Sequence, residues 1–482
     1  MRILISFVAI GVASLIAAAQ HPNVVFILAD DMGYMDIGAN NPQTFYETPN
    51  IDGLARTGMR FVEGYAACPV CSPTRASIMT GRYPARTGVT EWIGTQRVGK
   101  MQPAPYKDHL GLDETTIAEA FRDQGYATFM AGKWHLGTEK YAPSAQGFPQ
   151  DLVALPGEYY PPADATPLDK VNDPKSTERI VDAAVRFIGA SQNKPFFAYL
   201  PFRAVHLPLG ARPELQEKYR RKRASAPPDV FIEDRGAKVR QVQADPGYAA
   251  MVEQFDTGVG RVLAALHQHG LAERTIVVFT SDNGGVSTAQ GQPTSNLPLR
   301  AGKGWLYEGG IRVPWIIRAP GVTKAGAVCE TPVISNDFFP TLLDLAGLPL
   351  LPERHCDGVT LRPLLEGRTL AQRALYWHYP HYGGQGGFPG GVVREGDWKL
   401  IEWYEDGSLE LFNLHDDLGE KKNLAAAQLA KTEELHAKLV VWRTEVKGIM
   451  PTLNPHYKGD PPAPPKGGRQ KKGGKKNNEQ QK

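Results

Sequence analysis

The sequence predicts an α/β fold in which a large, mostly parallel (mixed) central sheet is sandwiched between helices. The apolar segments that resemble strands are continuous rather than alternating, which is typical of strands covered on both faces. They alternate along the chain with helical patterns, the order expected for a largely parallel sheet. With 482 residues, of which 42% are apolar and 22% charged, the chain can bury a large core.

The elements of this main domain follow one another from residue 20 to residue 349. We predict its strands at 23–28, 126–130, 195–200, 275–280 and 313–317, and helices at 114–124, 176–190 and 248–267. After Gly347 glycine-rich turns separate shorter strands, which we predict at 374–379, 391–394, 398–403 and 409–413, followed by a helix at 426–447. This pattern predicts a smaller antiparallel sheet with a terminal helix, in a second domain at 350–455.

The two ends of the chain lie outside these domains. Residues 1–19 combine Met1-Arg2, an apolar run and three alanines, which predicts a cleaved signal peptide, with an N-terminal membrane anchor as the alternative. No later stretch is long and apolar enough to cross a bilayer, so we expect an exported protein, either periplasmic or secreted. From Lys466 onward there are seven Lys or Arg residues and one acid. We predict a disordered basic tail at 456–482, which either binds anionic polymers or only aids solubility.

Acidic and amide side chains follow two of the predicted strands. Asp30 and Asp31 come after the first strand, and Asp282 and Asn283 follow the strand at 275–280. Polar groups at the carboxyl ends of parallel strands gather in one crevice, where these oxygen ligands suit Ca²⁺ or Mg²⁺ rather than zinc. The alternatives are a helix cap at Asp31, a solvated Asp30 and a simple turn at 282–284. Because the two signals support each other, the sequence favours a metal site.

Cationic or titratable side chains also follow strands or lie on glycine-rich loops. A lone histidine is usually structural and a lone lysine is usually solvated, but five such groups near one metal would form a strong anion site. Lysine and arginine can bind a tetrahedral oxyanion, and histidine can protonate a leaving oxygen. We find no nucleic-acid-binding motif. The five candidate residues are Arg75, Lys133, His135, His206 and Lys303.

Several segments, taken in order, resemble the motifs of one enzyme family. The run from Cys71 to Ser77, continued by Thr80-Gly81-Arg82, is similar to the first signature of the type I sulfatases. The run 125–135 resembles their second signature, and 30–33, 281–284 and 303–314 resemble their metal motifs and a later block. The resemblance extends from about residue 22 to 415 and is highly specific. It implies the alkaline phosphatase-like fold, hydrolysis of sulfate esters and a catalytic domain at 20–349.

The resemblance also implies a mechanism. In this family a cysteine in a Cys-x-Pro-x-Arg frame is oxidised to formylglycine by a formylglycine-generating or anaerobic maturating enzyme, and only Cys71 fits that frame. One hydroxyl of the aldehyde hydrate would attack sulfur, and the second would later expel sulfate. One divalent ion, most often Ca²⁺, would be bound by Asp30, Asp31, Cys71, Asp282 and Asn283. The other implied roles are sulfate binding by Arg75, Lys133 and Lys303, protonation of the leaving group by His206 with Lys303, and breakdown of the sulfated intermediate by His135.

The substrate is less well specified than the reaction. The family and the signal peptide suggest sulfated sugars, which Lys133, His206 and Lys303 would contact. Ordinary packing is the alternative for every residue of the predicted pocket rim. The rim candidates are Trp92, Trp305, Tyr307 and the glycine-rich loop from His378 through His381 to Gly391.

Three other functions are weighed against the sulfatase. A phosphoryl or phosphonate hydrolase of the related fold would generally use zinc or manganese with more histidine ligands, and a silent binding protein would need a broken motif. A thiol-disulfide protein would begin a helix with its Cys-x-x-Cys pair in a much smaller fold, whereas we place Cys68 and Cys71 in a loop before Pro73. If Cys71 is converted, three thiols remain. We then predict a disulfide between Cys329 and Cys356 and a reduced Cys68.

Overall fold

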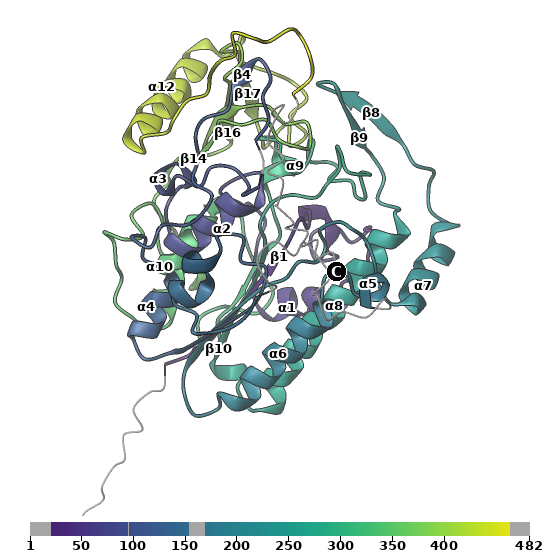
Figure 1. Cartoon of the computed structure of the whole chain (residues 1–482), viewed down its shortest axis with the longest axis vertical. Helices are drawn as coiled ribbons and strands as arrows, with labels where there is room; N and C mark the ends of the chain where they lie inside the picture. The colour runs from purple at the N-terminus through teal and green to yellow at the C-terminus, as the bar shows by residue number, and fades with distance from the viewer. Residues whose placement is uncertain (1–20, 95, 154–168, 463–482) are drawn as a thin grey trace, which may run out of the picture.

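The computed structural model describes residues 21–94, 96–153 and 169–462 (Figure 1). The predicted signal peptide lies outside these residues, and so does most of the predicted basic tail. Within the described ranges, no helix is both long and apolar enough to span a membrane.

The centre of the fold is a mixed sheet of eight strands. Every strand runs in the same direction except β11, which is antiparallel to both of its neighbours. This arrangement confirms the predicted mixed, mostly parallel sheet. In spatial order the strands are β12 (Ala327–Cys329), β2 (Met59–Phe61), β11 (Trp315–Arg318), β10 (Thr275–Ser281), β1 (Asn23–Ala29), β7 (Phe196–Pro201), β5 (Ala127–Gly132) and β6 (Gln150–Val153).

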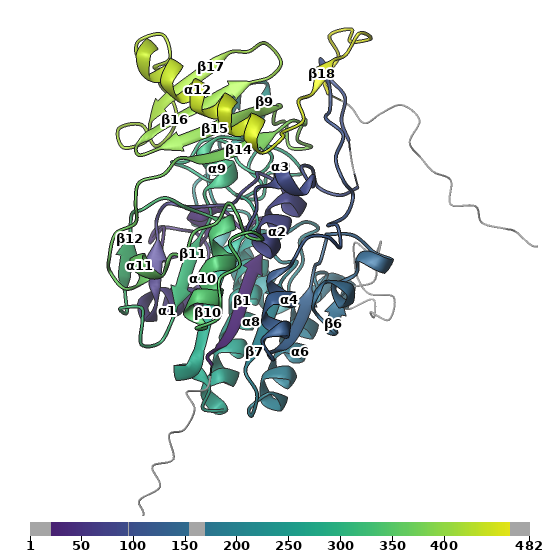
Figure 2. The same ribbon diagram turned by 90° about the vertical axis from the view of Figure 1, so that its left-hand side faces the viewer.

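Helices cover both faces of this sheet, which explains why its strands are apolar on both sides (Figure 2). In β1, Val25 and Ile27 belong to one buried cluster, and Val24 and Phe26 belong to the other. Burying such side chains is the main stabilising contribution to the fold, about 1.5–3 kcal/mol each. The first cluster includes α1 (Pro49–Thr57), α6 (Thr177–Ala190) and α8 (Pro246–Gln268), and the second includes α2 (Cys71–Thr80), α4 (Ile117–Asp123) and α10 (Phe338–Leu345).

The C-terminal part forms a separate antiparallel sheet of four strands, as predicted. Its strands are β14 (Leu375–Tyr379), β15 (Gly390–Glu395), β16 (Trp398–Trp403) and β17 (Leu409–Asn413), and α12 (Leu429–Glu445) packs against them. A third buried cluster joins this sheet to loops and short elements of the main domain, because Trp377 and Trp403 belong to the same cluster as Tyr65 and Trp305. The proposed boundary near residue 350 therefore crosses a shared core, and it stays a prediction.

Shorter elements connect these layers. They are β3 (Gly64–Tyr65) with β13 (Val333–Ile334), β4 (Met101–Gln102) with β18 (Thr452–Leu453), the hairpin β8 (Phe231–Asp234) and β9 (Ala237–Arg240), and the helices α3 (Pro84–Thr87), α5 (Asp169–Asn172), α7 (Pro213–Arg223), α9 (Glu308–Ile311) and α11 (Arg362–Leu365).

Two predictions about the cysteines are wrong. Cys71 does not lie in a loop, because it is the first residue of α2, and all ten residues of that helix are buried. Cys329 and Cys356 are both free thiols. Cys329 pairs with Phe61 in the edge strand β12, whereas Cys356 lies close to Arg82, so the two thiols belong to different environments.

Candidate active site

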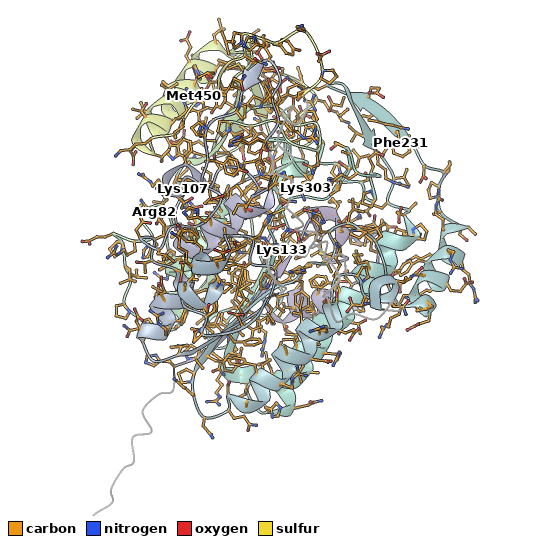
Figure 3. The ribbon with its side chains drawn as sticks, viewed as in Figure 1. Arg82, Lys107, Lys133, Phe231, Lys303 and Met450 are labelled. Atoms are coloured by element: carbon orange, nitrogen blue, oxygen red, sulfur yellow. The ribbon has the colours of Figure 1, made fainter. Side chains whose placement is uncertain are left out.

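The candidate site lies at the carboxyl ends of four adjacent parallel strands. In open α/β sheets this edge forms the crevice in which ligands bind. Figure 3 shows Lys133 and Lys303 near each other in the middle of the molecule. The predicted residues that follow these strands are Asp282 and Asn283 after β10, Asp30 and Asp31 after β1, His206 after β7, and Lys133 and His135 after β5.

Asp30 and Asp31 are buried, and each is paired with a lysine. Lys133 Nζ lies 2.7 Å from Asp30 Oδ2, and Lys303 Nζ lies 2.6 Å from Asp31 Oδ1. Burial alone would raise the pKa of both carboxyl groups, but the surrounding cations lower each pKa below its usual value. The backbone of Asp31 has a φ of 66°, and its N–H donates to Asp282 Oδ1 at 3.1 Å. Both carboxylates are therefore ionised and held in one place.

Arg75 is completely buried and holds Asp282 in place through two hydrogen bonds. Its Nε and Nη2 donate to Asp282 Oδ2 at 2.9 and 2.6 Å, and its Nη1 donates to the carbonyl of Lys133 at 2.8 Å. All three guanidinium nitrogens are thus used by the protein. The resemblance implies that Arg75 binds sulfate, and that role stays a prediction; in this structure its guanidinium contacts a carboxylate that can ligate a metal.

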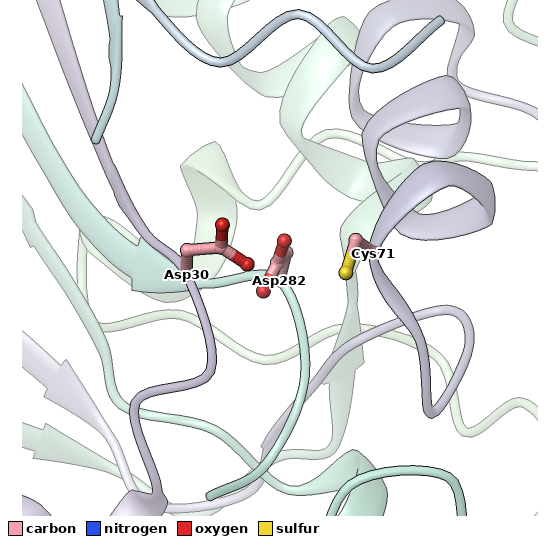
Figure 4. Close-up of side chains that lie close together, drawn as sticks. All are labelled: Asp30, Cys71 and Asp282. Atoms are coloured by element: carbon pink, nitrogen blue, oxygen red, sulfur yellow. The ribbon is translucent and has the colours of Figure 1, made fainter. Parts of the chain in front are cut away.

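The oxygens that converge here have too few hydrogen-bond donors. Among the described residues, Oδ1 of Asp30 and Oδ1 of Asn283 are buried without a partner, which is uncommon for buried polar atoms. One ligand atom from each of Asp30, Cys71 and Asp282 lies within 4.8 Å of the other two (Figure 4). Carboxylate and amide oxygens are the ligands that Ca²⁺ and Mg²⁺ prefer. The residues present therefore fit the divalent cation that the sequence implied.

Cys71 stands at the N-terminus of α2, where the positive end of the helix dipole faces the site. Burial raises the pKa of its thiol to about 11, although Lys133 and Lys303 oppose that shift. A thiol with so high a pKa is neutral and therefore a weak nucleophile. An unmodified Cys71 would contribute little to catalysis at this position.

Gly132 lets the end of β5 lie close to the end of β7, which sets the position of the Lys133 backbone. Its φ is 133°, and a Cβ at this position would lie 2.0 Å from the carbonyl oxygen of Pro201. The Lys133 N–H donates to the same carbonyl at 2.7 Å. Only glycine permits this close approach of β5 to the end of β7, which brings the Lys133 side chain to Asp30.

Six buried groups at the centre of the site carry charges that balance without any bound ion. Three carboxylates face three cations, so a divalent cation would add two positive charges. That excess suits an anionic ligand, because buried charges must be compensated. The six groups are those of Asp30, Asp31, Asp282, Arg75, Lys133 and Lys303.

His135 is a neutral imidazole at the wall of the site. Its Nε2 lies 3.0 Å from the carbonyl oxygen of Ile93, so Nε2 carries the proton and Nδ1 is left as an acceptor. Burial, followed by the charge of Lys133, lowers the pKa of His135 well below its usual value. The ring centroid of Trp92 is 6.4 Å from that of His135, and Trp92 is half-buried. Trp92 therefore lies beside His135, and its place at the substrate rim stays a prediction.

His206 is more exposed than the charged groups around it, with 22% of its side chain accessible. Its Nε2 lies 3.6 Å from Asp31 Oδ2, and its Nδ1 lies 2.6 Å from the carbonyl oxygen of Leu207. Because a carbonyl only accepts hydrogen bonds, Nδ1 carries a proton and Nε2 faces the site.

The two predicted rim histidines are not at a rim. His378 is buried, with its ring nitrogens 2.8 Å from the Tyr404 hydroxyl and 3.0 Å from the carbonyl oxygen of Ile449. His381 is also buried, and its Nε2 lies 2.9 Å from Thr90 Oγ1. Burial lowers the pKa of these histidines to about 4 and about 3, so both are neutral structural groups.

The other predicted rim residues, Trp305 and Tyr307, are buried in the cluster that joins the C-terminal sheet to the main domain. The glycine-rich loop after His381 is closely packed, because a Cβ at Gly387 would lie 1.7 Å from the carbonyl oxygen of Gly304. Its glycines allow two backbones to approach each other, and this close approach explains why the loop is not an adjustable rim.

Two buried ionisable residues near the site were missed in the sequence. Lys175 is 1% exposed, and the charges of Asp30 and Asp31 act on it. Glu91 accepts hydrogen bonds from the Trp92 N–H at 2.8 Å and the Tyr379 hydroxyl at 3.1 Å. Neither residue follows a predicted strand or stands in a motif, so no sequence pattern distinguishes them from solvated surface charges.

The chain matches the profile of the Sulfatase family over residues 22–348. It matches a second profile, described as N-sulphoglucosamine sulphohydrolase, C-terminal, over residues 301–445. A sulfatase of Formosa agariphila is 34% identical, with 85% of each chain covered. The N-acetylgalactosamine-6-sulfatase of Canis lupus familiaris is 31% identical, covering 91% of this chain and 82% of its own.

Solved structures show the same architecture. The crystal structure of Ps i-CgsB in complex with k-i-k-neocarrahexaose superimposes with a TM-score of 0.73 at 28% identity, covering 92% of this chain and 95% of its own. A phosphonate monoester hydrolase of Agrobacterium radiobacter shares the fold with a TM-score of 0.65 at 22% identity, covering 90% and 99%. The fold is therefore also found in a protein described as a phosphonate monoester hydrolase.

Proposed function

The chain belongs to the sulfatase family and hydrolyses sulfate esters, and we propose that it removes sulfate from carbohydrates with a formylglycine made from Cys71 beside a bound divalent cation. One observation carries this proposal. Cys71, Asp30 and Asp282 converge within 4.8 Å, and an oxygen of Asp30 is buried there without a hydrogen-bond partner.

The cation would be held by the carboxylate oxygens of Asp30, Asp31 and Asp282, by Asn283 Oδ1 and by the group made from Cys71. Bound there, it would polarise the sulfate oxygens and lower the pKa of the nucleophile. The all-oxygen ligand set favours Ca²⁺, with Mg²⁺ as the second choice. His206 Nε2 lies 3.6 Å from Asp31 Oδ2; we assign this nitrogen to the substrate rather than to the metal.

Formylglycine would supply a hydrate whose two hydroxyls serve as the nucleophile and as the group that later releases sulfate. The buried, neutral thiol of Cys71 gives the unmodified residue no comparable reactivity. The residues Cys71, Pro73 and Arg75 all lie in α2, which is buried throughout. We therefore expect a formylglycine-generating or anaerobic maturating enzyme to act on the unfolded chain, during export.

The remaining site residues bind sulfate and move protons. Lys133 and Lys303 would turn from Asp30 and Asp31 toward the sulfate oxygens once the cation neutralises those carboxylates. His206 presents Nε2 to the crevice and would protonate the leaving oxygen. His135 has an unpartnered Nδ1, which would accept a proton when the second hydroxyl releases sulfate.

The carbohydrate substrate class is supported by the named relatives and by the site. Two of the similar proteins described above are an N-acetylgalactosamine-6-sulfatase and a protein bound to a neocarrahexaose. In this chain the half-buried Trp92 offers an aromatic surface beside His135, on which a sugar ring can stack. We assign export to this chain because its first 19 residues have the pattern of a signal peptide.

A panel of substrates tests the proposal. Protein matured with a formylglycine-generating enzyme should release sulfate from sulfated oligosaccharides and from aryl sulfates, and should act far more slowly on phosphate and phosphonate esters. Cys71→Ser should fold as the wild type does and lose turnover, because serine has no second hydroxyl to expel sulfate. Full activity of Cys71→Ser, or a preference for phosphonate esters, would contradict the proposal.

A further inference from the structure

Lys175 is a buried lysine near the site, and it lies outside the sequence motifs that supply the other site residues. It lies just before α6, and only 1% of the residue is exposed. Its Nζ donates to the carbonyl oxygen of Leu207 at 2.5 Å. Burying a lysine is unfavourable without compensation, so the position needs an explanation beyond chance placement.

The same carbonyl also accepts a hydrogen bond from the catalytic histidine. His206 Nδ1 lies 2.6 Å from the Leu207 oxygen, which therefore receives two donors, one on each lone pair. This contact fixes the Nδ1–H tautomer of His206 and turns Nε2 toward Asp31, 3.6 Å away. Lys175 thus contacts the group that determines how His206 is oriented.

The backbone around Lys175 is held firmly. The Asp173 carboxylate accepts hydrogen bonds from the N–H groups of Thr177 and Glu178 at 2.8 and 2.9 Å, which fixes the start of α6. On the other side, a Cβ at Gly210 would lie 2.6 Å from the carbonyl oxygen of Val171. The segment that carries Lys175 is therefore packed directly against the segment that follows His206.

We propose that Lys175 is a positioning residue that holds the Leu207 carbonyl, and through it His206, in the geometry needed to protonate the leaving oxygen. The inference rests on the proposed function, in which His206 acts as that acid. In the step itself, an oxygen of the nucleophile would bond to sulfur as the S–O bond to the leaving group breaks and its electron pair stays on the leaving oxygen. His206 would enter the step as the imidazolium, with a proton taken up from water on Nε2, and would pass that proton to the leaving oxygen. His206 is left as the neutral Nδ1–H imidazole, still bonded to Leu207.

Lys175 acts on this step through geometry. It prevents the Leu207 carbonyl from turning, which keeps Nε2 directed at the crevice. Burial lowers the pKa of Lys175 to about 7, with Asp30 and Asp31 opposing that shift, which agrees with its place beside the charged centre.

Two substrates with different leaving groups distinguish a role of Lys175 in positioning His206 from a purely structural role. An aryl sulfate with a good leaving group, such as 4-nitrophenyl sulfate, needs little protonation, whereas a sulfated sugar alcohol needs it fully. We expect Lys175→Met to lower kcat on the sugar sulfate by about 10- to 100-fold and on the aryl sulfate by less than about threefold. The KM for both should change little, and Lys175→Arg should restore most of the kcat because it keeps a cationic donor.

Equal losses on both substrates, or no loss on either, would overturn the inference. Should Lys175→Met fail to fold, the ¹⁵N shifts of the His206 ring in the wild-type protein decide instead: a neutral ring protonated on Nδ1 is expected, and one protonated on Nε2 contradicts the inference.

His206→Asn separates this inference from the function on which it rests. If His206→Asn loses activity selectively on the sugar sulfate but Lys175→Met does not, only the role of Lys175 is wrong. If His206→Asn affects both substrates equally, the assignment of His206 as the acid is wrong as well.

Discussion

Replacing Arg75 by leucine should destabilise the protein and weaken cation binding together. The guanidinium makes two hydrogen bonds to Asp282 Oδ2, at 2.9 and 2.6 Å, and one to the Lys133 carbonyl at 2.8 Å, all in a fully buried environment. Breaking a buried ion pair by removing one partner typically costs about 3–5 kcal/mol. We expect a loss of about that size in the free energy of unfolding of Arg75→Leu.

Protonation of the Asp282 carboxyl group limits this loss in the free energy of unfolding. Burial and the neighbouring Asp30 already raise the pKa of Asp282 to about 6 with Arg75 present. Without Arg75, Asp282 should take up a proton near neutral pH, which relieves its buried charge but removes it as a metal ligand. We therefore expect at least a tenfold weaker Ca²⁺ affinity, equivalent to about 1.4 kcal/mol. Arg75→Lys keeps the charge but not the paired geometry, and should lie between wild type and Arg75→Leu.

Urea unfolding at pH 7 with a chelator, together with calorimetric titration of Ca²⁺, measures both quantities. The alternative role for Arg75, direct sulfate binding, predicts a raised KM with normal stability and normal cation affinity. An Arg75→Leu protein that is as stable as the wild type and binds Ca²⁺ equally well would refute the role of Arg75 in holding Asp282 in place.

Three further predictions follow from the same geometry. Burial raises the pKa of Glu91 from 4.5 to about 8, so its contribution to stability is full below about pH 4.5 and is lost as the pH rises from there to about 8; in urea unfolding, Glu91→Gln should match the wild type at pH 4 and exceed it at pH 9 by up to about 5 kcal/mol, whereas a gain that does not depend on pH would contradict the raised pKa. Gly132→Ala should lower the free energy of unfolding by about 1–3 kcal/mol and abolish most activity, because its Cβ would lie 2.0 Å from the Pro201 oxygen; a fully active Gly132→Ala would show that this close approach does not position Lys133. Ca²⁺ at about 100 times its dissociation constant should stabilise the wild type by about 2.7 kcal/mol but leave the melting temperature of Asp30→Asn nearly unchanged, and an equal shift in both proteins would place the cation elsewhere.

Much of the fold could be predicted because its signals are local. The strands β1, β7 and β10 are continuous apolar runs that end in polar residues, and each was predicted within one residue of its bounds. The short strands β2, β12 and β6 were missed, since three or four residues carry no distinct period. The helix α2 was missed because it is buried on all sides, so its sequence has no apolar stripe against a polar face.

The site was predicted better at its centre than at its rim. Asp30, Asp282 and Lys133 follow strands directly, so the sheet itself brings them together. By contrast, the roles of Arg75 and His378 depend on tertiary contacts that no local pattern reveals. Glycines suggested a flexible loop near His381, but they serve close backbone packing instead. Lys175 was missed for the same reason, because its partner is a carbonyl 32 residues away.

The central claim is that Cys71 works as an aldehyde and not as a thiol. Mass spectrometry of the tryptic peptide that spans residues 61–75 tests it most directly, since this peptide contains both Cys68 and Cys71. In an active preparation we expect a peptide with one thiol and one aldehyde, the aldehyde at position 71, and the fraction of converted peptide should rise in proportion to the activity. A fully active protein whose peptide carries two unmodified thiols would contradict the account.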